Sequence, residues 1–187
     1  RGFCLVNDVV ITLRKMQSAG LIKTAWIVDV DVHKGDGAPE ILQNDPTIRT
    51  MSVHMKEGWP LNTGSVRDPW FIPSSVDVGL DVGEEDQYLA RLEAGLEEMN
   101  ERFPNPDVVI VVNGADPYEA DELPSASFLN LTKEQMLARD IFLCQYFKTK
   151  NIPQSYVMAG GYGQKSWEIY LQFLKFVGEN ASLRLKS

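Results

Sequence analysis

The chain has 187 residues, and its 26 acidic against 18 basic side chains give a formal net charge of −8. This length predicts one domain over residues 1–187, and hydrophobic and charged fractions of 44% and 24% are those of a globular protein, which excludes a disordered or collagen-like chain. The negative charge disfavours a nucleic-acid partner, and no apolar run of the sequence approaches the roughly 20 residues that a membrane crossing needs.

The sequence contains two cysteines, Cys4 and Cys144. Two thiols are too few for a disulfide framework or a four-cysteine zinc site, and they favour a reducing, cytoplasmic location. Both side chains are predicted to lie in the core.

Strand and helix patterns alternate along the chain. The first half predicts a helix through Val6, Val10, Leu13 and Met16, strands over residues 24–30 and 48–53, a long loop over 55–75 and a strand over 76–80. The second half predicts a helix through Tyr88, Leu92, Leu96, Met99 and Phe103, followed by a strand over 107–112. A second helix begins at Thr132 and carries Leu137, Ile141 and Cys144 on one face. A strand over 155–158 and a helix through Trp167, Tyr170, Leu171, Leu174 and Val177 follow.

Most of the predicted strands are apolar without alternation, which is typical of strands covered on both faces in a parallel sheet. Strands that alternate with helices indicate βαβ units. The sequence therefore predicts an α/β fold, a three-layer α/β/α sandwich with a mainly parallel sheet. In such folds ligands bind at the carboxyl ends of the strands, so the residues that follow each strand are the candidates for function.

The strand over 24–30 is followed by two carboxylates and an imidazole. Side chains alternate along an extended chain, so Asp29, Asp31 and His33 point the same way. Like charges so close together favour a bound metal ion, although a solvated acidic loop is the alternative. A calcium loop is excluded, because Lys34 stands where such a loop needs glycine.

The strand over 107–112 leads into Asn113-Gly114-Ala115-Asp116. Parallel strands bring Asp116 to the same edge as Asp31 and His33. One imidazole and two carboxylates form a three-ligand set that leaves a coordination position open, as catalytic zinc requires. On its own, Asp116 would more often be a turn residue or a helix cap.

The strand over 155–158 is followed by Gly160-Gly161-Tyr162. This glycine-rich turn satisfies neither of the common phosphate-binding patterns. It favours instead a Tyr162 hydroxyl presented at the strand end, where it could donate a hydrogen bond to a developing oxyanion. A surface aromatic on a flexible turn is the alternative.

Taken together, these segments resemble the histone deacetylase superfamily, including bacterial acetylpolyamine deacetylases. The matching segments are Gly2-Phe3-Cys4 with Asn7-Asp8, residues 29–37, Ser52-Val53-His54, residues 60–64, residues 113–116 and Gly160-Gly161-Tyr162. They cover nearly the whole chain, and the Asp-x-Asp-Val-His-x-Gly-Asp-Gly block is the most specific. The resemblance implies an arginase/deacetylase fold and a zinc-dependent amidohydrolase that removes an acetyl or other acyl group from lysine or polyamine amides.

The resemblance also implies roles for individual residues. Asp31, His33 and Asp116 match the zinc ligands, Tyr162 matches the tyrosine that polarises the acetyl carbonyl, and Asp36 matches a carboxylate that orients a catalytic histidine. The implied structural potassium site behind the zinc consists of Asp29, Asp31, His33, Ser52 and the carbonyl of Val53. The implied tunnel for the acyl-lysine stem consists of Gly2, Phe3, Trp59 and Gly160.

The sequence departs from the family pattern in its histidines. The family uses two adjacent histidines upstream of Gly-Phe-Cys as general base and acid, whereas this chain contains only His33 and His54. His54 is predicted to be a packed core histidine. Lys34 replaces a second histidine of the family pattern, and residues 125–128 replace a glycine-containing stretch; both changes are expected near the pocket rim.

These observations predict the carboxyl part of a deacetylase domain, with the first strands and the histidine pair of the family missing and near-zero turnover by this chain alone. The alternative is a non-catalytic, metal-bearing module that retains acyl-lysine recognition. A two-manganese hydrolase of the arginase type needs further ligands that the sequence lacks. The expected partners are an acetylated lysine peptide or an acetylpolyamine, together with the missing amino-terminal segment or a second copy of the chain, and neither nucleic acid nor membrane.

Overall fold

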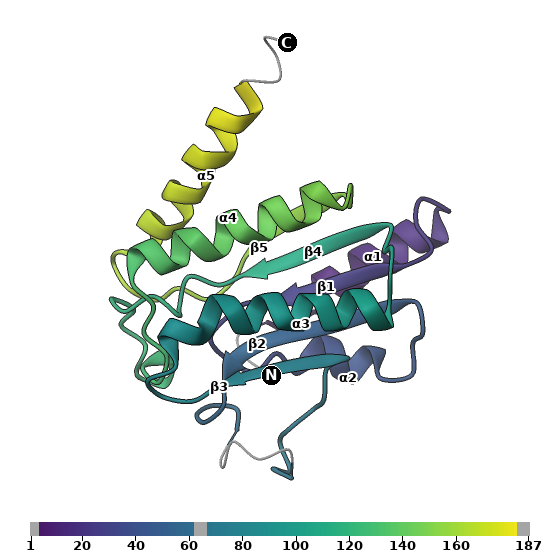
Figure 1. Ribbon diagram of the computed structural model, residues 1–187. Coiled ribbons are helices and arrows are strands. Elements are labelled where there is room, and N and C mark those ends of the chain that lie inside the picture. The colour runs from purple at the N-terminus through teal and green to yellow at the C-terminus, as the bar shows by residue number, and fades with distance from the viewer. Residues whose placement is uncertain (1–3, 62–66, 183–187) are drawn as a thin grey trace.

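The computed structural model describes residues 4–61 and 67–182, in which one sheet is covered by helices (Figure 1). The strands are β1 (Ala25–Asp29), β2 (Ile48–Met55), β3 (Val76–Leu80), β4 (Val108–Asn113) and β5 (Gln154–Met158). The helices are α1 (Asp8–Ser18), α2 (Gly37–Leu42), α3 (Tyr88–Arg102), α4 (Lys133–Thr149) and α5 (Ser166–Ser182), with one-turn 3-10 helices η1 (Glu85–Gln87) and η2 (Pro124–Ala126).

The sheet has the strand order β3-β2-β1-β4-β5, and all four neighbouring pairs are parallel. The carboxyl ends of all five strands therefore lie along one edge. In register, Asp29 at the end of β1 pairs with Ser52 on β2 and with Val112 on β4. This register brings the segments that follow β1 and β4 next to each other.

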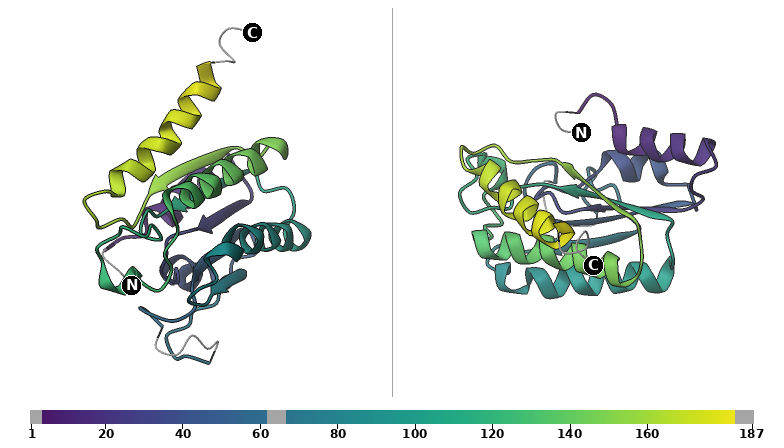
Figure 2. Two further views of the ribbon diagram at one scale, coloured as in Figure 1. Left: turned by 60° about the vertical axis from the view of Figure 1, so that its left-hand side comes forward. Right: turned by 90° about the horizontal axis from the view of Figure 1, so that it is seen from above.

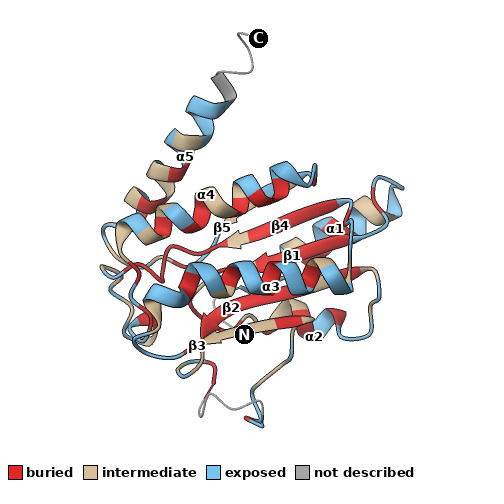
Figure 3. Cartoon of the chain, viewed as in Figure 1, coloured by how far each residue is buried: buried red, intermediate tan, exposed pale blue. Residues whose placement is uncertain are grey.

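Helices cover both faces of the sheet, which confirms the predicted three-layer α/β fold. Trp26 and Val28 of β1 belong to the hydrophobic cluster that contains the buried residues of α3 and α4. Ala25 and Ile27 belong to a second cluster with α1 and α2 on the opposite face. Figure 2 shows the two helical layers on either side of the sheet, and Figure 3 shows the central strands buried. Within residues 4–61 and 67–182, none of the helices combines the length and apolar character that a membrane crossing demands.

The predicted buried face of α4 is wrong. Leu137, Ile141 and Cys144 are only half-buried, and the core side of the helix instead includes Arg139, Asp140 and other residues. The fully buried residues of the helix are Met136, Arg139, Asp140, Leu143, Tyr146 and Phe147. Because Arg139 and Asp140 are charged, the hydropathy pattern does not identify the buried side of this helix. The predicted cap is confirmed, since the Thr132 hydroxyl accepts from the Gln135 backbone N–H.

Three smaller predictions also differ from the structure. The α2 helix was not predicted, because Gly37 and Pro39 disfavour a helix interior; here Pro39 lies in the first turn, where its missing N–H costs little. Cys4 is exposed and does not lie in the core. On α5, Trp167, Leu171, Leu174 and Val177 of the predicted apolar stripe are exposed, and the buried apolar side chains of the helix include Ile169 and Phe173.

Candidate metal centre

Three side chains that follow β1 and β4 meet at the carboxyl edge of the sheet. Asp31 and His33 lie two and four residues beyond the end of β1, and Asp116 lies three residues beyond β4. One potential ligand atom from each lies within 4.8 Å of the others. The structure thus brings together the three residues that the sequence singled out as metal ligands.

Backbone and side-chain hydrogen bonds hold this group in place. His33 Nδ1 lies 3.0 Å from Asp31 Oδ1 and 3.2 Å from Asp116 Oδ2. The Gly160 N–H donates to Asp31 Oδ2 at 2.9 Å, and the Val32 N–H donates to Asp116 Oδ1 at 3.0 Å. Asp31 Oδ1 also accepts from the His33 backbone N–H at 3.0 Å, so each carboxylate is fixed by backbone donors and directs one oxygen toward the imidazole.

The electrostatics of the three groups are strongly coupled. Burial raises the pKa of Asp116 to about 7, despite the opposing effect of its hydrogen bond with His33. Burial alone would lower the pKa of His33, but hydrogen bonds with Asp116 and Asp31 outweigh it and raise that pKa to about 9. For Asp31 the same contacts with His33 overcome burial and lower the pKa. Both carboxylates face the same imidazole nitrogen, His33 Nδ1, which cannot satisfy the two of them fully.

A divalent cation fits this arrangement. Asp116 is fully buried, and apart from the ion-pair contact with His33 Nδ1 at 3.2 Å its Oδ2 has no donor among the described residues. Asp31 Oδ1 faces the same Nδ1, and a buried carboxylate oxygen with so little hydrogen bonding is costly. Because one imidazole nitrogen and two carboxylate oxygens are ligands that zinc and similar ions accept, a metal ion would satisfy all three groups at once.

Two glycines make room for the carboxylates. A Cβ atom at Gly160 would overlap the carboxylates of Asp31 and Asp116, and a Cβ atom at Gly114 would come within 2.7 Å of Asp116 Oδ1. The Ala115 N–H donates to the Gly160 carbonyl at 2.6 Å and ties the two segments together. Gly160, which the resemblance places in the tunnel, therefore packs directly on the metal-ligand candidates.

Aromatic residues flank the cluster. The Trp59 ring, which is nearly half exposed, contacts the His33 ring edge-to-face with centroids 5.6 Å apart. Burial, followed by the charges of Asp31 and Asp116, raises the pKa of Tyr162 to about 12. The Tyr162 backbone N–H donates to Asp121 Oδ2 at 2.7 Å. The Tyr162 phenol therefore feels the charge of the two carboxylates and keeps its proton at neutral pH.

Three of the residues implied as potassium ligands, Asp29, Ser52 and Val53, lie on the neighbouring strands β1 and β2. Asp29 and Ser52 are neighbours in the register of β1 and β2, and Val53 follows Ser52. Burial, and then the charge of Asp31, raise the pKa of Asp29 well above its usual range. A cation close to Asp29 would relieve this cost, and a potassium ion there stays a prediction.

Other predicted residues have varied surroundings. Asp36 is buried at the start of α2. Lys34 is buried and does not line a pocket rim as expected, because its Nζ donates to Ser74 Oγ at 2.9 Å and pairs with Asp77. His54 is buried as predicted, and burial and the charge of Lys34 lower its pKa to about 4. The tunnel residues Gly2 and Phe3 lie outside the described residues.

The sequence predicts residues 125–128 near the pocket rim, as Ser125 is found, but it indicates neither the contact of Ser125 with His33 nor any part for Arg139. Ser125 Oγ in η2 lies 3.2 Å from His33 Nε2. Arg139 on α4 donates to the carbonyls of Val30 and Gly114, one residue before Asp31 and two residues before Asp116. Neither residue belongs to a motif. The only sequence signal for the role of Arg139 is the charged pair Arg139 and Asp140 within an otherwise apolar helix face.

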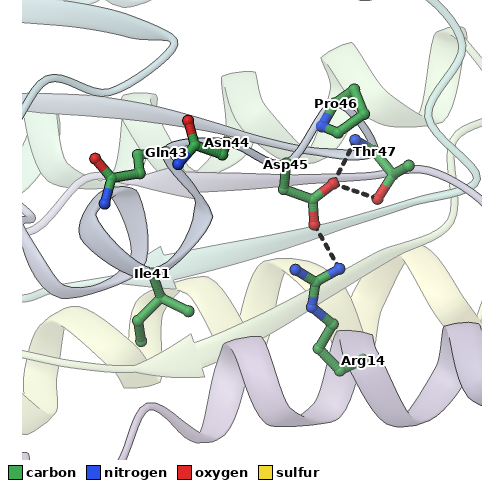
Figure 4. A pocket seen from close by; sticks show the side chains of 7 residues that line it. All are labelled: Arg14, Ile41, Gln43, Asn44, Asp45, Pro46 and Thr47. Carbon is green, nitrogen blue, oxygen red and sulfur yellow. Dashed lines mark hydrogen bonds and ion pairs between the residues drawn. The ribbon is translucent and has the colours of Figure 1, made fainter.

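A surface pocket of about 430 Å³ lies elsewhere, at the amino end of β2 (Figure 4). Its lining residues are Arg14, Ile41, Gln43, Asn44, Asp45, Pro46 and Thr47. In it, Arg14 pairs with Asp45, whose carboxylate also accepts from Thr47. The charged groups of this pocket satisfy one another, and the pocket lies at the opposite edge of the sheet from Asp31, so we assign it no part in the site.

Comparisons with known proteins agree with this geometry. The family model described as histone deacetylase domain matches residues 1–173. An uncharacterized protein of Picosynechococcus sp. is 33% identical over 164 residues, which are 87% of this chain and 51% of that protein. The chain therefore spans about half the length of this curated relative.

Two solved structures share the fold. The HD domain of HDA15 superposes with a TM-score of 0.73 at 23% identity, covering 94% of this chain and 51% of that one. An acetylpolyamine aminohydrolase from Burkholderia pseudomallei gives a TM-score of 0.70 at 22% identity, covering 92% of this chain and 49% of that one. At these identities the two structures support the α/β fold alone.

Proposed function

The chain belongs to the histone deacetylase family, and we propose that it is the carboxyl part of a zinc-dependent deacetylase domain that hydrolyses acyl amides of lysine or of a polyamine. The observation that carries this proposal is the cluster of Asp31, His33 and Asp116, whose ligand atoms lie within 4.8 Å of one another at the carboxyl edge of the sheet. When bound there, zinc supplies Lewis acidity and lowers the pKa of water.

The other residues of the site would act on the substrate. The Tyr162 phenol, whose pKa is about 12, stays protonated and can donate a hydrogen bond to the acyl oxygen as negative charge develops on it. Trp59, packed edge-to-face on His33, provides an apolar wall for the stem of an acyl-lysine side chain. Asp29 and Ser52, with the carbonyl of Val53 and the nearby Asp31 and His33, would hold potassium and so neutralise the buried charge of Asp29.

The histidine content favours a second candidate, a metal-bearing module that binds acyl-lysine without hydrolysing it. His33 and His54 are the only histidines of the sequence. His33 belongs to the ligand cluster, and buried His54, with a pKa of about 4, is a poor base at neutral pH. Neither residue can replace the general base and acid of the family. A cytoplasmic location, in keeping with the two cysteines, is part of the same proposal.

Acetate release distinguishes the two candidates. With zinc bound, residues 1–187 are expected to bind an acetyl-lysine peptide more tightly than its unmodified form. They are expected to hydrolyse it about 10²- to 10⁴-fold more slowly than a longer protein in which an upstream segment with two adjacent histidines precedes the same residues. Binding without hydrolysis by both proteins would favour the module. Equal affinity for acetylated and unmodified peptides would contradict both candidates.

In the active form, Tyr162→Phe is expected to lower kcat by about 10²- to 10³-fold while KM changes little, because the lost hydrogen bond forms mainly in the transition state. Steady-state kinetics on an acetyl-lysine peptide measure both constants. A higher KM with unchanged kcat would assign Tyr162 to substrate binding instead.

Zinc binding is expected to strengthen as the pH rises from about 6 to 9. His33, whose pKa is about 9, must lose the proton on Nδ1 before that nitrogen can bind a metal, so protons compete with zinc below this pH. The affinity should rise about tenfold per pH unit for each proton displaced. Competition with a chromophoric chelator at several pH values measures it, and an affinity independent of pH over this range would contradict the assigned ligand.

A further inference from the structure

The two nitrogens of the His33 ring face different partners. Nδ1 faces the carboxylates of Asp31 and Asp116, whereas Nε2 lies 3.2 Å from the hydroxyl oxygen of Ser125. Ser125 comes from η2, 92 residues further along the chain. The contact is therefore a tertiary one, made where residues 125–128 depart from the glycine-containing stretch of the family pattern.

A histidine that binds a metal through Nδ1 carries its proton on Nε2. His33 is buried, with 8% of its surface exposed, so water offers little compensation for an unpaired N–H. The Ser125 hydroxyl oxygen can accept a hydrogen bond from this N–H. Partners of this kind fix the orientation and tautomer of metal-binding histidines.

The η2 turn that carries Ser125 is itself anchored. Asp121 Oδ1 accepts from the Leu123 N–H at 2.9 Å, just before the turn, and Asp121 Oδ2 accepts from the Tyr162 N–H at 2.7 Å. Inside the turn, the Ala126 N–H donates to the Leu123 carbonyl. One carboxylate thus ties the segment that holds Ser125 to the segment that holds Tyr162.

We propose that Ser125 is a positioning residue of the metal centre: its hydroxyl accepts the Nε2–H of His33 and keeps Nδ1 directed at Asp31 and Asp116. This inference rests on the proposed metal site. It goes beyond that site in assigning a supporting role to a residue outside the ligand set. The role requires the hydroxyl group and does not depend on the shape of the turn alone.

Three variants test the proposal by zinc affinity, measured in competition with a chromophoric chelator. Ser125→Ala is expected to raise the Kd for zinc by about 10- to 100-fold. Ser125→Thr, which keeps the hydroxyl, should recover most of this loss. Ser127→Ala is the matched control, because Ser127 is exposed and donates to the Pro124 carbonyl in the same turn; its Kd should stay at the wild-type value.

An unchanged Kd in Ser125→Ala would overturn the proposal. So would an equal loss in Ser127→Ala, which would trace the effect to the turn, or a Ser125→Thr variant as weak as alanine. A second measurement tests the contact between Ser125 and His33 independently of whether the protein binds zinc. Without zinc, the NMR signal of the His33 Nε2–H should exchange with water faster in Ser125→Ala than in wild type; equal exchange rates would overturn the contact even if wild type bound no zinc.

Discussion

Replacing Gly160 with alanine is expected to abolish tight zinc binding. The new Cβ would overlap the carboxylates of both Asp31 and Asp116, so neither could keep its position next to His33. Loss of a supporting contact costs metal sites about 10- to 100-fold in affinity, and displacement of two ligands should cost more. Zinc per chain after exhaustive dialysis, measured by atomic emission, should fall from one to none.

The control for this variant is Gly178→Ala. Gly178 lies on α5, and a Cβ there meets nothing within 4 Å. Because alanine is the better helix former, this variant should fold at least as stably as wild type and bind zinc equally well. Retention of one tightly bound zinc by Gly160→Ala would show that zinc binds at another place on the chain.

Replacing Arg139 with alanine is expected to destabilise the protein by about 3–5 kcal/mol, the usual cost of removing one partner of a buried ion pair. The guanidinium is fully buried and pairs with Asp140, which has no exposed surface either. It also donates to Asn113 Oδ1 and to the carbonyls of Val30 and Gly114. Without Arg139, a buried carboxylate and three acceptors lose their donor.

Urea unfolding of wild type and Arg139→Ala measures this loss of stability. Arg102→Ala is the control, because Arg102 forms an exposed i,i+4 pair with Glu98 that should contribute less than about 1 kcal/mol. A loss below about 1 kcal/mol in Arg139→Ala would contradict the structural role of this guanidinium. Zinc affinity should fall in parallel, since Arg139 anchors the backbone just before Asp31 and close to Asp116.

The sequence predicted the architecture and the metal-ligand candidates because both follow from local rules. Apolar β-branched runs marked the strands of a parallel sheet, and parallel strands place their carboxyl ends at one edge. That rule placed Asp116 at the same edge as Asp31 and His33, more than 80 residues away in sequence, and the pairing of β4 with β1 brings them into contact. Gly160, Gly161 and Tyr162 follow the strand over 155–158, so the same rule placed Tyr162 at this edge of the sheet.

The contacts that support the site could not be predicted, because they depend on tertiary packing. Ser125 reaches His33 through a turn without regular periodicity. Arg139 is a charged residue on a buried helix face, the reverse of what hydropathy predicts. Lys34 is buried against Asp77 on β3, and no spacing rule relates the two. The resemblance places Gly160 in the tunnel, but its close packing on the carboxylates of Asp31 and Asp116 is seen only in the three-dimensional structure.

A crystal structure with zinc, with anomalous differences recorded across the zinc absorption edge, tests the metal site most directly. We predict a single peak at about 2.0–2.2 Å from His33 Nδ1 and from one carboxylate oxygen each of Asp31 and Asp116. A peak at another place on the chain, or no peak at saturating zinc, would contradict the proposal that these three residues form the catalytic metal centre.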